Sequence, residues 1–216
     1  MQLPAGSFSE WLRAMGDALG GSAGMDVACG DCVGCCTSSY FIKVRAHETR
    51  ALAAIPAEHV SPVPGRTNGD QHMGYLPNGH CPMFGDGGCT IYQDRPETCR
   101  TYDCRVFTAT GMKAGGDDKS VINERVASWR FDYPAPQDDA EQRALLAAAN
   151  FIRQHPIRFP NGRVPSRPSE VAVLAVKAYR VFLRATESPV LSDAEISAAI
   201  IEACREFDRN AKAAAG

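Results

Sequence analysis

The sequence predicts a mainly α protein in which a small, irregular α+β, cysteine-rich module precedes an α-helical C-terminal part. Three observations support this fold class. Eight of the nine cysteines lie between residues 29 and 104, and residues 56–80 are rich in Pro, Gly and Asn. Apolar residues recur at helical spacing near the N-terminus and throughout the C-terminal half. We therefore expect an N-terminal helix packing on the core over residues 1–24, a cysteine-rich module over 25–110 and a helical part over 111–216.

Composition excludes several function classes. With 216 residues and 44% apolar content, the chain can bury a sizeable core without cross-links. Its formal charge of -2 provides no basic field, so we expect no nucleic-acid partner. The sequence shows neither a basic leader nor an apolar stretch long enough to cross a bilayer, so we expect a cytoplasmic protein without membrane contact. In a reducing compartment, dense cysteine indicates metal or redox chemistry more often than disulfides.

The N-terminal segment is expected to form an amphipathic helix. Ser7 and Glu10 have capping-box spacing, and the pair Gly20-Gly21 ends the pattern. The apolar residues of this segment recur on one face of a helix: Phe8, Leu12, Met15 and Leu19.

The first half of the cysteine-rich module carries weak local signals. Residues 39–44, "SYFIKV", favour a strand, and residues 46–55 favour a short helix that ends before Pro56. We expect residues 56–80 to form a loop.

The second half carries stronger signals. The letters "GDGG" predict a turn between Cys81 and Cys89, and the following "CTIY" favours a short strand. Asp94 and Glu97 have capping-box spacing, which predicts a short helix carrying Cys99.

The C-terminal part begins after a polar loop over residues 111–119. We expect a short helix over 121–129, a longer one over 138–155 that Pro156 stops, a third over 169–185, and a last one that starts near Asp193 behind a Ser192–Glu195 capping box. The alanine-rich helices permit close packing, either within the chain or against a protein partner or a second copy in a homodimer.

The eight cysteines form two groups with metal-ligand spacing: Cys29, Cys32, Cys35 and Cys36, then Cys81, Cys89, Cys99 and Cys104. A two-residue gap brings two thiolates around one ion, and here the gap repeats at once to give C-x2-C-x2-C. Cys29, Cys32 and Cys35 are thus expected to form a tripod, as in the run that binds three corners of a 4Fe-4S cluster. Cys81 precedes a proline, which is the form of the fourth ligand in that run.

The metal stays open between iron and zinc. Eight thiols also satisfy two tetrahedral zinc sites, or one cluster with bridging thiolates. Neighbouring side chains diverge, so Cys35 and Cys36 would serve two metal atoms, and Cys36 is either a terminal ligand or a bridge. A disulfide between these two adjacent residues would be strained.

Other polar residues accompany the cysteines. Arg95 and Arg100 flank Cys99 and are candidates for cofactor binding, because guanidinium groups can offset thiolate charge and donate hydrogen bonds to sulfur. If Cys99 and Cys104 bind one site, the helix must end between them, because residues five apart lie on different faces.

Three more side chains receive other interpretations. His80 is a further possible ligand, although the thiols suffice without it. Asp103 is expected at the surface or as a cap, and Cys204 as a buried free thiol.

The two blocks "CGDCVGCC" and "CPMFGDGGCTIYQDRPETCRTYDC" closely resemble the CxxCxxCC cysteine-cluster family, described as zinc- or iron-chelating proteins. The second block supplies the family's Gly-x-Cys-x-Ile-Tyr-x-x-Arg-Pro-x-x-Cys-Arg-x-Tyr pattern, and the resemblance covers about residues 25–107. It implies metal binding by the matched cysteines. A similar cluster in flagellin lysine methylases is associated with an iron–sulfur centre, but this chain is shorter and has no evident counterpart to their remaining domain.

The sequence therefore predicts a metal-binding protein whose cysteines hold an iron–sulfur cluster, 4Fe-4S foremost, or zinc, in a structural, electron-transfer or metal-handling role. Two alternatives stand beside it: a cluster-dependent enzyme, for example with protein methylase-like activity, and a zinc-stabilised interaction module. A thiol–disulfide protein is disfavoured, because the βαβ context of thioredoxin-like proteins is missing. No Walker A, G-x-S-x-G or H-E-x-x-H pattern supplies a second site.

Overall fold

The chain forms two compact units in a computed structural model that describes residues 1–21, 24–25, 27, 31–159, 167–185 and 191–215. The helical unit comprises Met1–Ala23, Asp103–Ala114 and Val126–Gly216. The cysteine unit comprises Gly24–Tyr102 and Gly115–Arg125. Helices predominate over three small sheets among the described residues, which confirms the expected mainly α fold class. No helix in the described part of the chain has the length and apolarity needed to cross a membrane.

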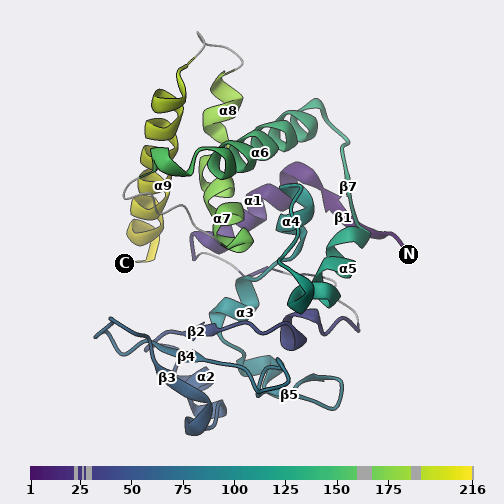
Figure 1. The fold of residues 1–216 in the computed structure, drawn as a ribbon, viewed down its shortest axis with the longest axis vertical. Helices are drawn as coiled ribbons and strands as arrows, with labels where there is room; N and C mark the ends of the chain where they lie inside the picture. Colours follow the sequence, from purple (N-terminus) through teal and green to yellow (C-terminus); the bar gives the residue numbers. More distant parts are fainter. Residues whose placement is uncertain (22–23, 26, 28–30, 160–166, 186–190, 216) are drawn as a thin grey trace. The chain divides into compact units, whose positions relative to one another are not determined.

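The helical unit combines a two-stranded parallel sheet with a bundle of helices (Figure 1). Its elements are β1 (Leu3–Ser7), α1 (Phe8–Leu19), α4 (Arg105–Ala109), β7 (Trp129–Asp132), α6 (Pro136–Gln154), the 3-10 turn η5 (Pro156–Arg158), α7 (Pro168–Ala178), α8 (Arg180–Ala185) and α9 (Asp193–Ala215). Strand β1 pairs with β7, α6 packs against α7 and α8, and α7 packs against α9.

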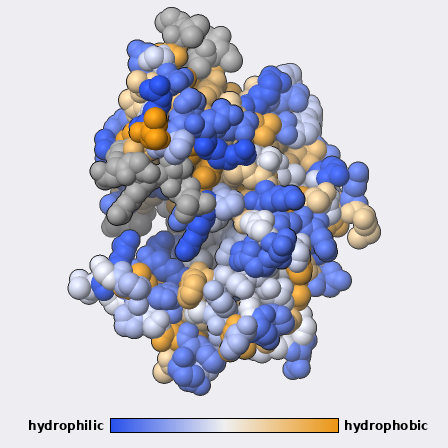
Figure 2. Space-filling model, in the orientation of Figure 1, coloured by the Kyte–Doolittle hydropathy of each residue, from blue (hydrophilic) through white to orange (hydrophobic). Residues whose placement is uncertain are grey.

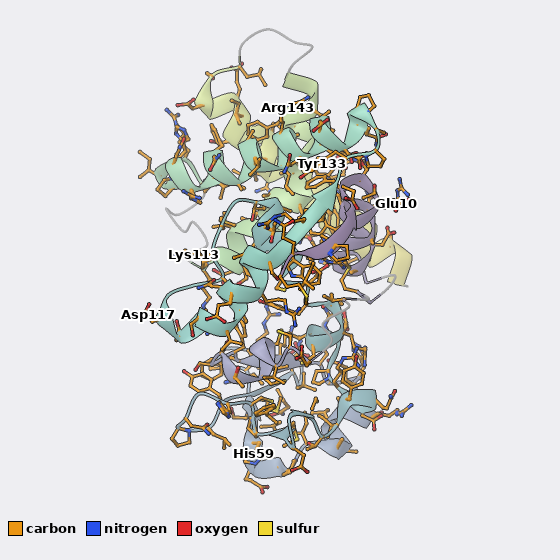
Figure 3. The ribbon with its side chains drawn as sticks, turned by 90° about the vertical axis from the view of Figure 1, so that its right-hand side faces the viewer. Glu10, His59, Lys113, Asp117, Tyr133 and Arg143 are labelled. Carbon is orange, nitrogen blue, oxygen red and sulfur yellow. The ribbon has the colours of Figure 1, made fainter. Side chains whose placement is uncertain are left out.

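The core of this unit is aromatic at one end and rich in alanine at the other. The ring of Phe8 contacts those of Trp11 and Phe131 and stacks on Tyr133, which is labelled in Figure 3. Helices α6 and α7 approach closely because small side chains fill their interface: Ala144, Ala148, Ala149, Ala172, Ala175 and Ala178 are all buried. The alanine-rich helices thus pack against one another within the chain.

Two helix starts in this unit differ in how they are capped. The Ser192–Glu195 capping box of α9 is confirmed, since each residue accepts a hydrogen bond from the other's backbone N–H. The predicted capping box of α1 is wrong, because the Ser7 side chain makes no capping hydrogen bond. The helix itself lies where it was expected. Ser7 instead donates its hydroxyl to the buried carboxylate of Asp138, which also accepts the Ser9 N–H.

Two further expectations for this unit need correction. The helix expected over 169–185 is divided at Tyr179 into α7 and α8. Asp103 is not a surface residue. It is 2% exposed and accepts hydrogen bonds from the Trp11 indole and from the backbone and side chain of Arg105.

The cysteine unit is built from short elements. They are the 3-10 turn η1 (Gly34–Thr37), β2 (Ile42–Val44), α2 (Thr49–Ala54), η2 (Ala57–His59), β3 (Val60–Pro62), β4 (Gln71–Met73), β5 (Phe84–Gly85), β6 (Gly88–Cys89), η3 (Tyr92–Asp94), α3 (Glu97–Thr101), η4 (Asp117–Lys119) and the first part of α5 (Ser120–Ser128). On the face drawn in Figure 2, the surface of this unit is mostly hydrophilic with separate apolar patches.

The unit's small core lies on an antiparallel sheet of order β2-β4-β3. One core cluster consists of Val44, Ala51, Ile55, Met73 and Met83, and Cys81 packs against it. The expected loop over 56–80 is therefore wrong in part, because β3 and β4 lie within it. These strands are three residues long and largely polar, so their pairing depends on partners that are distant in sequence, such as Ile42 with Met73.

Candidate metal centre

Backbone hydrogen bonds join the two cysteine groups of the sequence. Cys36 lies in η1, where its N–H donates to the Val33 carbonyl. Its own carbonyl accepts the Cys81 N–H at 2.7 Å, and the Ser39 N–H donates to the Gly79 carbonyl at 2.9 Å. The chain on either side of Cys36 is thus fixed against the chain that leads to Cys81.

A tight hairpin places Cys89 near this junction. Strand β5 pairs with β6, so that Phe84 faces Cys89, and the Phe84 N–H donates to the Cys81 carbonyl. Asp86 and Gly87 form the turn with φ of 48° and 78°, as a type I′ turn requires. The expected turn is confirmed. The expected strand over "CTIY" is wrong, because the strand ends at Cys89 and η3 begins at Tyr92.

Helix α3 carries Cys99 and is tied to the rest of the unit at its first turn. The Glu97 N–H donates to the buried Glu48 carboxylate, and the Thr98 hydroxyl donates to the Lys43 carbonyl at 2.7 Å. The expected Asp94–Glu97 cap is wrong: α3 has no side-chain cap of its own, and Asp94 pairs with Arg50 at 2.6 Å. The helix ends at Thr101, between Cys99 and Cys104.

Four thiols from these three segments interact electrostatically. Burial, together with the neighbouring thiols of Cys81, Cys89 and Cys32, raises the pKa of Cys36 to about 11. Burial likewise raises the pKa of Cys99 to about 12, together with Cys81, Cys89 and Cys36, while the Arg95 charge opposes the shift. Thiolates repel one another only at short range, so these side chains lie close together. We call Cys36, Cys81, Cys89 and Cys99 the four-thiol group.

The remaining predicted ligands have different surroundings. The Cys32 sulfur lies against Gly34, 3.5 Å from where a Cβ on that glycine would stand. Cys35 is exposed. Cys29 lies outside the described residues, so the expected tripod stays a prediction. Cys104 belongs to the helical unit, where it is 6% exposed and accepts a hydrogen bond from the Trp129 indole at 3.3 Å.

The ninth cysteine lies far along the sequence from both groups. Cys204 is half-buried in α9, and burial raises the pKa of its thiol to about 11. Its thiol points to the Leu174 carbonyl, 3.9 Å from the sulfur. This placement agrees with a free thiol that packs as a small apolar side chain.

The two candidate arginines have different partners. The Arg95 guanidinium lies 3.9 Å from the Tyr92 ring centroid, and its charge lowers the pKa of Cys99. Arg100 donates to the Arg95 carbonyl and lies 3.8 Å from the Glu48 carboxylate. Of the two, Arg95 acts electrostatically on the Cys99 thiol, and Arg100 lies beside the Glu48 carboxylate.

His80, the candidate non-thiol ligand, is engaged elsewhere in the unit. Its ring packs edge-on against Phe84, with 5.4 Å between ring centroids. Its backbone N–H donates to the Asn78 side chain at 3.1 Å.

Two residues that organise the site were not singled out from the sequence. Glu48 is 9% exposed and accepts the backbone N–H groups of both Arg45 and Glu97. Lys119 is 9% exposed and lies against the backbone that follows Cys36. Neither residue can be identified from the sequence, because each looks like an ordinary charged residue when its partners in the fold are not known.

The donor chemistry of the four-thiol group suits a metal. Thiolates are the soft ligands that zinc and iron–sulfur clusters take in proteins, and a cation at their centre would stabilise the ionised form of each thiol. Among the described residues, no three His, Cys, Asp or Glu side chains already stand at the spacing of ligands to one ion.

Residues 28–124 match the family model "CxxCxxCC: Putative zinc- or iron-chelating domain". The match confirms the resemblance seen in the two cysteine blocks and supports metal binding by this segment. It also extends beyond Cys104 to the residues 115–124 that complete the cysteine unit. No curated protein and no solved structure matches the chain.

Proposed function

We propose that the cysteine unit binds a metal centre through the four-thiol group and that this centre stabilises the unit. The observation that carries the proposal is that the fold gathers thiols from η1, the β5–β6 hairpin with its leading segment, and α3. Burial first, and then the neighbouring thiols, raise the pKa of Cys36 and of Cys99. The ionised forms of these thiols would repel one another, and a bound cation would stabilise them as thiolates, so a metal accounts for the gathering of four thiols from separate segments.

The metal we propose is iron in an iron–sulfur cluster. The proline after Cys81 supports this assignment, since a Cys-Pro ligand recurs in cluster-binding proteins. Such a cluster would add one-electron chemistry to the unit. Tetrahedral zinc bound by the same four thiolates is the second candidate, favoured by a group of four such ligands. Zinc has no redox chemistry, so the unit would then serve structure alone.

The stabilising role follows from the small core of the unit. Five buried apolar residues make up its core cluster, and its strands are two or three residues long. Small, loop-rich domains of this kind are usually held by metals or disulfides. Metal binding therefore contributes directly to the folding free energy of the cysteine unit.

The test is anaerobic purification of the full chain, followed by metal analysis and an absorption spectrum. We expect brown protein with broad visible absorption from sulfur-to-iron charge transfer. Colourless protein with stoichiometric zinc would overturn the iron assignment but keep the metal centre. Replacing Cys99→Ser should remove most of the bound metal, whereas Cys204→Ser, a matched change in the helical unit, should leave the metal content unchanged. Equal metal in both variants would contradict the ligand set.

A further inference from the structure

The segment 115–125 lies outside both cysteine groups yet packs on the loop that carries the first of them. Arg125 pairs with Asp31 at 3.6 Å, and Ile122 contacts Gly34, where an added Cβ would stand 3.0 Å from the Ile122 side chain. Lys119 lies in the same segment and is 9% exposed. The segment thus lines the backbone of residues 31–40 over most of its length.

Lys119 directs its buried cation at the backbone just after Cys36. Its ammonium group donates to the Ser38 carbonyl, lies 3.4 Å from the Ser39 carbonyl, and stands 4.3 Å from the Tyr40 ring centroid. Its fourth partner is the Asp118 carboxylate at 2.9 Å. A buried ammonium is costly unless it is paired. Three of the four partners of the ammonium group belong to one short loop, Ser38–Tyr40. The ammonium group therefore stabilises the conformation of that loop.

That loop holds a strained conformation next to the four-thiol group. Ser39 has φ of 53°, which non-glycine residues adopt rarely and only when the surroundings fix it. Ser38 is fully buried, and its hydroxyl donates to the Gly34 carbonyl at 2.5 Å. The Ser39 N–H of the same loop donates to the Gly79 carbonyl, and Cys36, two residues before the loop, accepts the Cys81 N–H, so the position of the loop affects where Cys36 lies relative to Cys81.

We propose that Lys119 is a positioning residue for the metal centre: it fixes the Ser38–Tyr40 backbone and thereby holds Cys36 beside Cys81. This inference rests on the proposed function. It assigns a role to a residue outside the cysteine groups and accounts for the inclusion of residues 115–125 in the same unit. Outer partners that orient ligands in this way typically contribute 10–100-fold to metal affinity.

The experiment uses Co²⁺ as the probe, titrated anaerobically into the metal-free full chain and read by its thiolate charge-transfer and d–d bands. We expect Lys119→Met to weaken Co²⁺ binding by about 10–100-fold and to shift the d–d bands, which report ligand geometry. Lys119→Arg keeps the charge and donors and should recover part of the affinity. Lys113→Met, at an exposed lysine labelled in Figure 3, is the control and should match the unsubstituted protein.

A purely structural role gives a different result. Lys119→Met would then lower the unfolding midpoint of the metal-free protein while the Co²⁺ affinity and spectrum stayed unchanged, and this outcome overturns the proposal. If Lys119→Met does not fold, Gly115→Ala takes its place, because the added Cβ would stand 2.7 Å from the Lys119 side chain and displace it. Unchanged Co²⁺ binding in that variant also overturns the proposal. An unsubstituted protein that gives no thiolate band would instead contradict the proposed function itself.

Discussion

At the scale of single residues, the thiols of Cys36 and Cys99 have the clearest chemical signature. Their pKa values of about 11 and 12 lie above the ordinary value of 9.0. Both groups are therefore protonated thiols at neutral pH in the metal-free protein. Metal binding requires thiolates, so each of the two must release a proton when a metal arrives.

The first prediction concerns pH and metal affinity. Because protons compete with the metal at Cys36 and Cys99, the apparent association constant should rise by about 100-fold or more per pH unit between roughly pH 6 and 9. Calorimetric titration with Zn²⁺ in buffers of different ionisation enthalpy measures both the affinity and the protons released. An affinity that does not vary with pH would show that these thiols are not ligands.

The metal-free protein should depend on pH in the opposite sense. A group whose pKa is raised in the folded state stabilises that state fully below its unfolded pKa and loses this contribution as pH rises through the folded value. With an unfolded value of 9.0 and folded values of about 11 and 12, stability should fall between pH 9 and 12. Thermal unfolding of the metal-free chain across this range is the check, and a midpoint that stays flat would rule out the raised pKa values.

The second prediction concerns Gly34, where the cysteine loop meets α5. A Cβ at this position would stand 3.0 Å from Ile122 and 3.5 Å from the Cys32 sulfur. Gly34→Ala should therefore destabilise the cysteine unit by about 1–3 kcal/mol through overpacking, as measured by denaturant unfolding. Gly88→Ala is the matched control, because no atom lies within 4 Å of its added Cβ. Equal stability of the two variants would mean that the loop is not packed as described.

At the scale of elements, the short β5–β6 hairpin positions the proposed ligand Cys89. Its Asp86-Gly87 turn requires positive φ at both central residues. The third prediction is that Gly87→Ala costs about 1 kcal/mol of stability and releases metal faster, because Cys89 follows directly in β6. Asp86→Asn suits the same turn and should change neither quantity. The measurement is the rate of metal release to a chromophoric chelator. Identical rates for both variants would show that the hairpin does not help to hold the metal.

In the helical unit, the Asp138 carboxylate joins the starts of α1 and α6. It accepts hydrogen bonds from the Ser9 and Ala135 N–H groups and from the Ser7 hydroxyl, and these bonds, the Ser9 one foremost, hold its pKa below the ordinary value. A lowered pKa stabilises the folded state above the unfolded value of 3.8, and this contribution is lost as pH falls through the folded value.

The fourth prediction follows from that linkage. Asp138→Asn should lower the urea midpoint of the helical unit at pH 7 and flatten its loss of stability below pH 4. The neighbouring Asp139 is exposed, so Asp139→Asn serves as the control and should retain both the midpoint and the acid sensitivity. If both variants behaved like the unsubstituted protein, the carboxylate would not be joining the two helices.

At the scale of the whole molecule, the two units differ in what holds them together. The helical unit buries large side chains such as Phe8, Phe107 and Leu145, whereas the cysteine unit has a core cluster of five residues. The fifth prediction is that chelation of the metal exposes backbone amides of residues 31–102 and 115–125 to hydrogen exchange while those of α6 and α7 stay protected. Uniform loss of protection in both units would contradict a metal that stabilises the cysteine unit alone.

The features that could be predicted from the sequence are those with local causes. The helical spacing of Phe8, Leu12 and Met15 located α1, and the Asp86-Gly87 turn was evident because only a few residue pairs suit it. The spacing of the cysteines also identified the candidate ligands and the resemblance to the family. It did not predict which of the adjacent residues Cys35 and Cys36 belongs to the four-thiol group.

The features that were missed depend on distant partners. Strands β3 and β4 have no apolar alternation, and they form because β4 pairs with β2 on one side and with β3 on the other. Ser7 and Asp94 have capping-box spacing, but in the fold Ser7 donates its hydroxyl to Asp138 and Asp94 pairs with Arg50. Lys119 contacts backbone carbonyls. Every residue has one, so the residue types of the loop do not predict this contact.

The most direct test of the central claim is X-ray absorption at the metal edge of the protein as purified without oxygen. Four sulfur neighbours at about 2.3 Å are expected around the metal, with additional iron neighbours if the centre is a cluster. In the Cys99→Ser variant the sulfur shell should lose one neighbour or the metal should be absent. A first shell dominated by nitrogen or oxygen, or a protein that carries no metal at all, would contradict a centre held by Cys36, Cys81, Cys89 and Cys99.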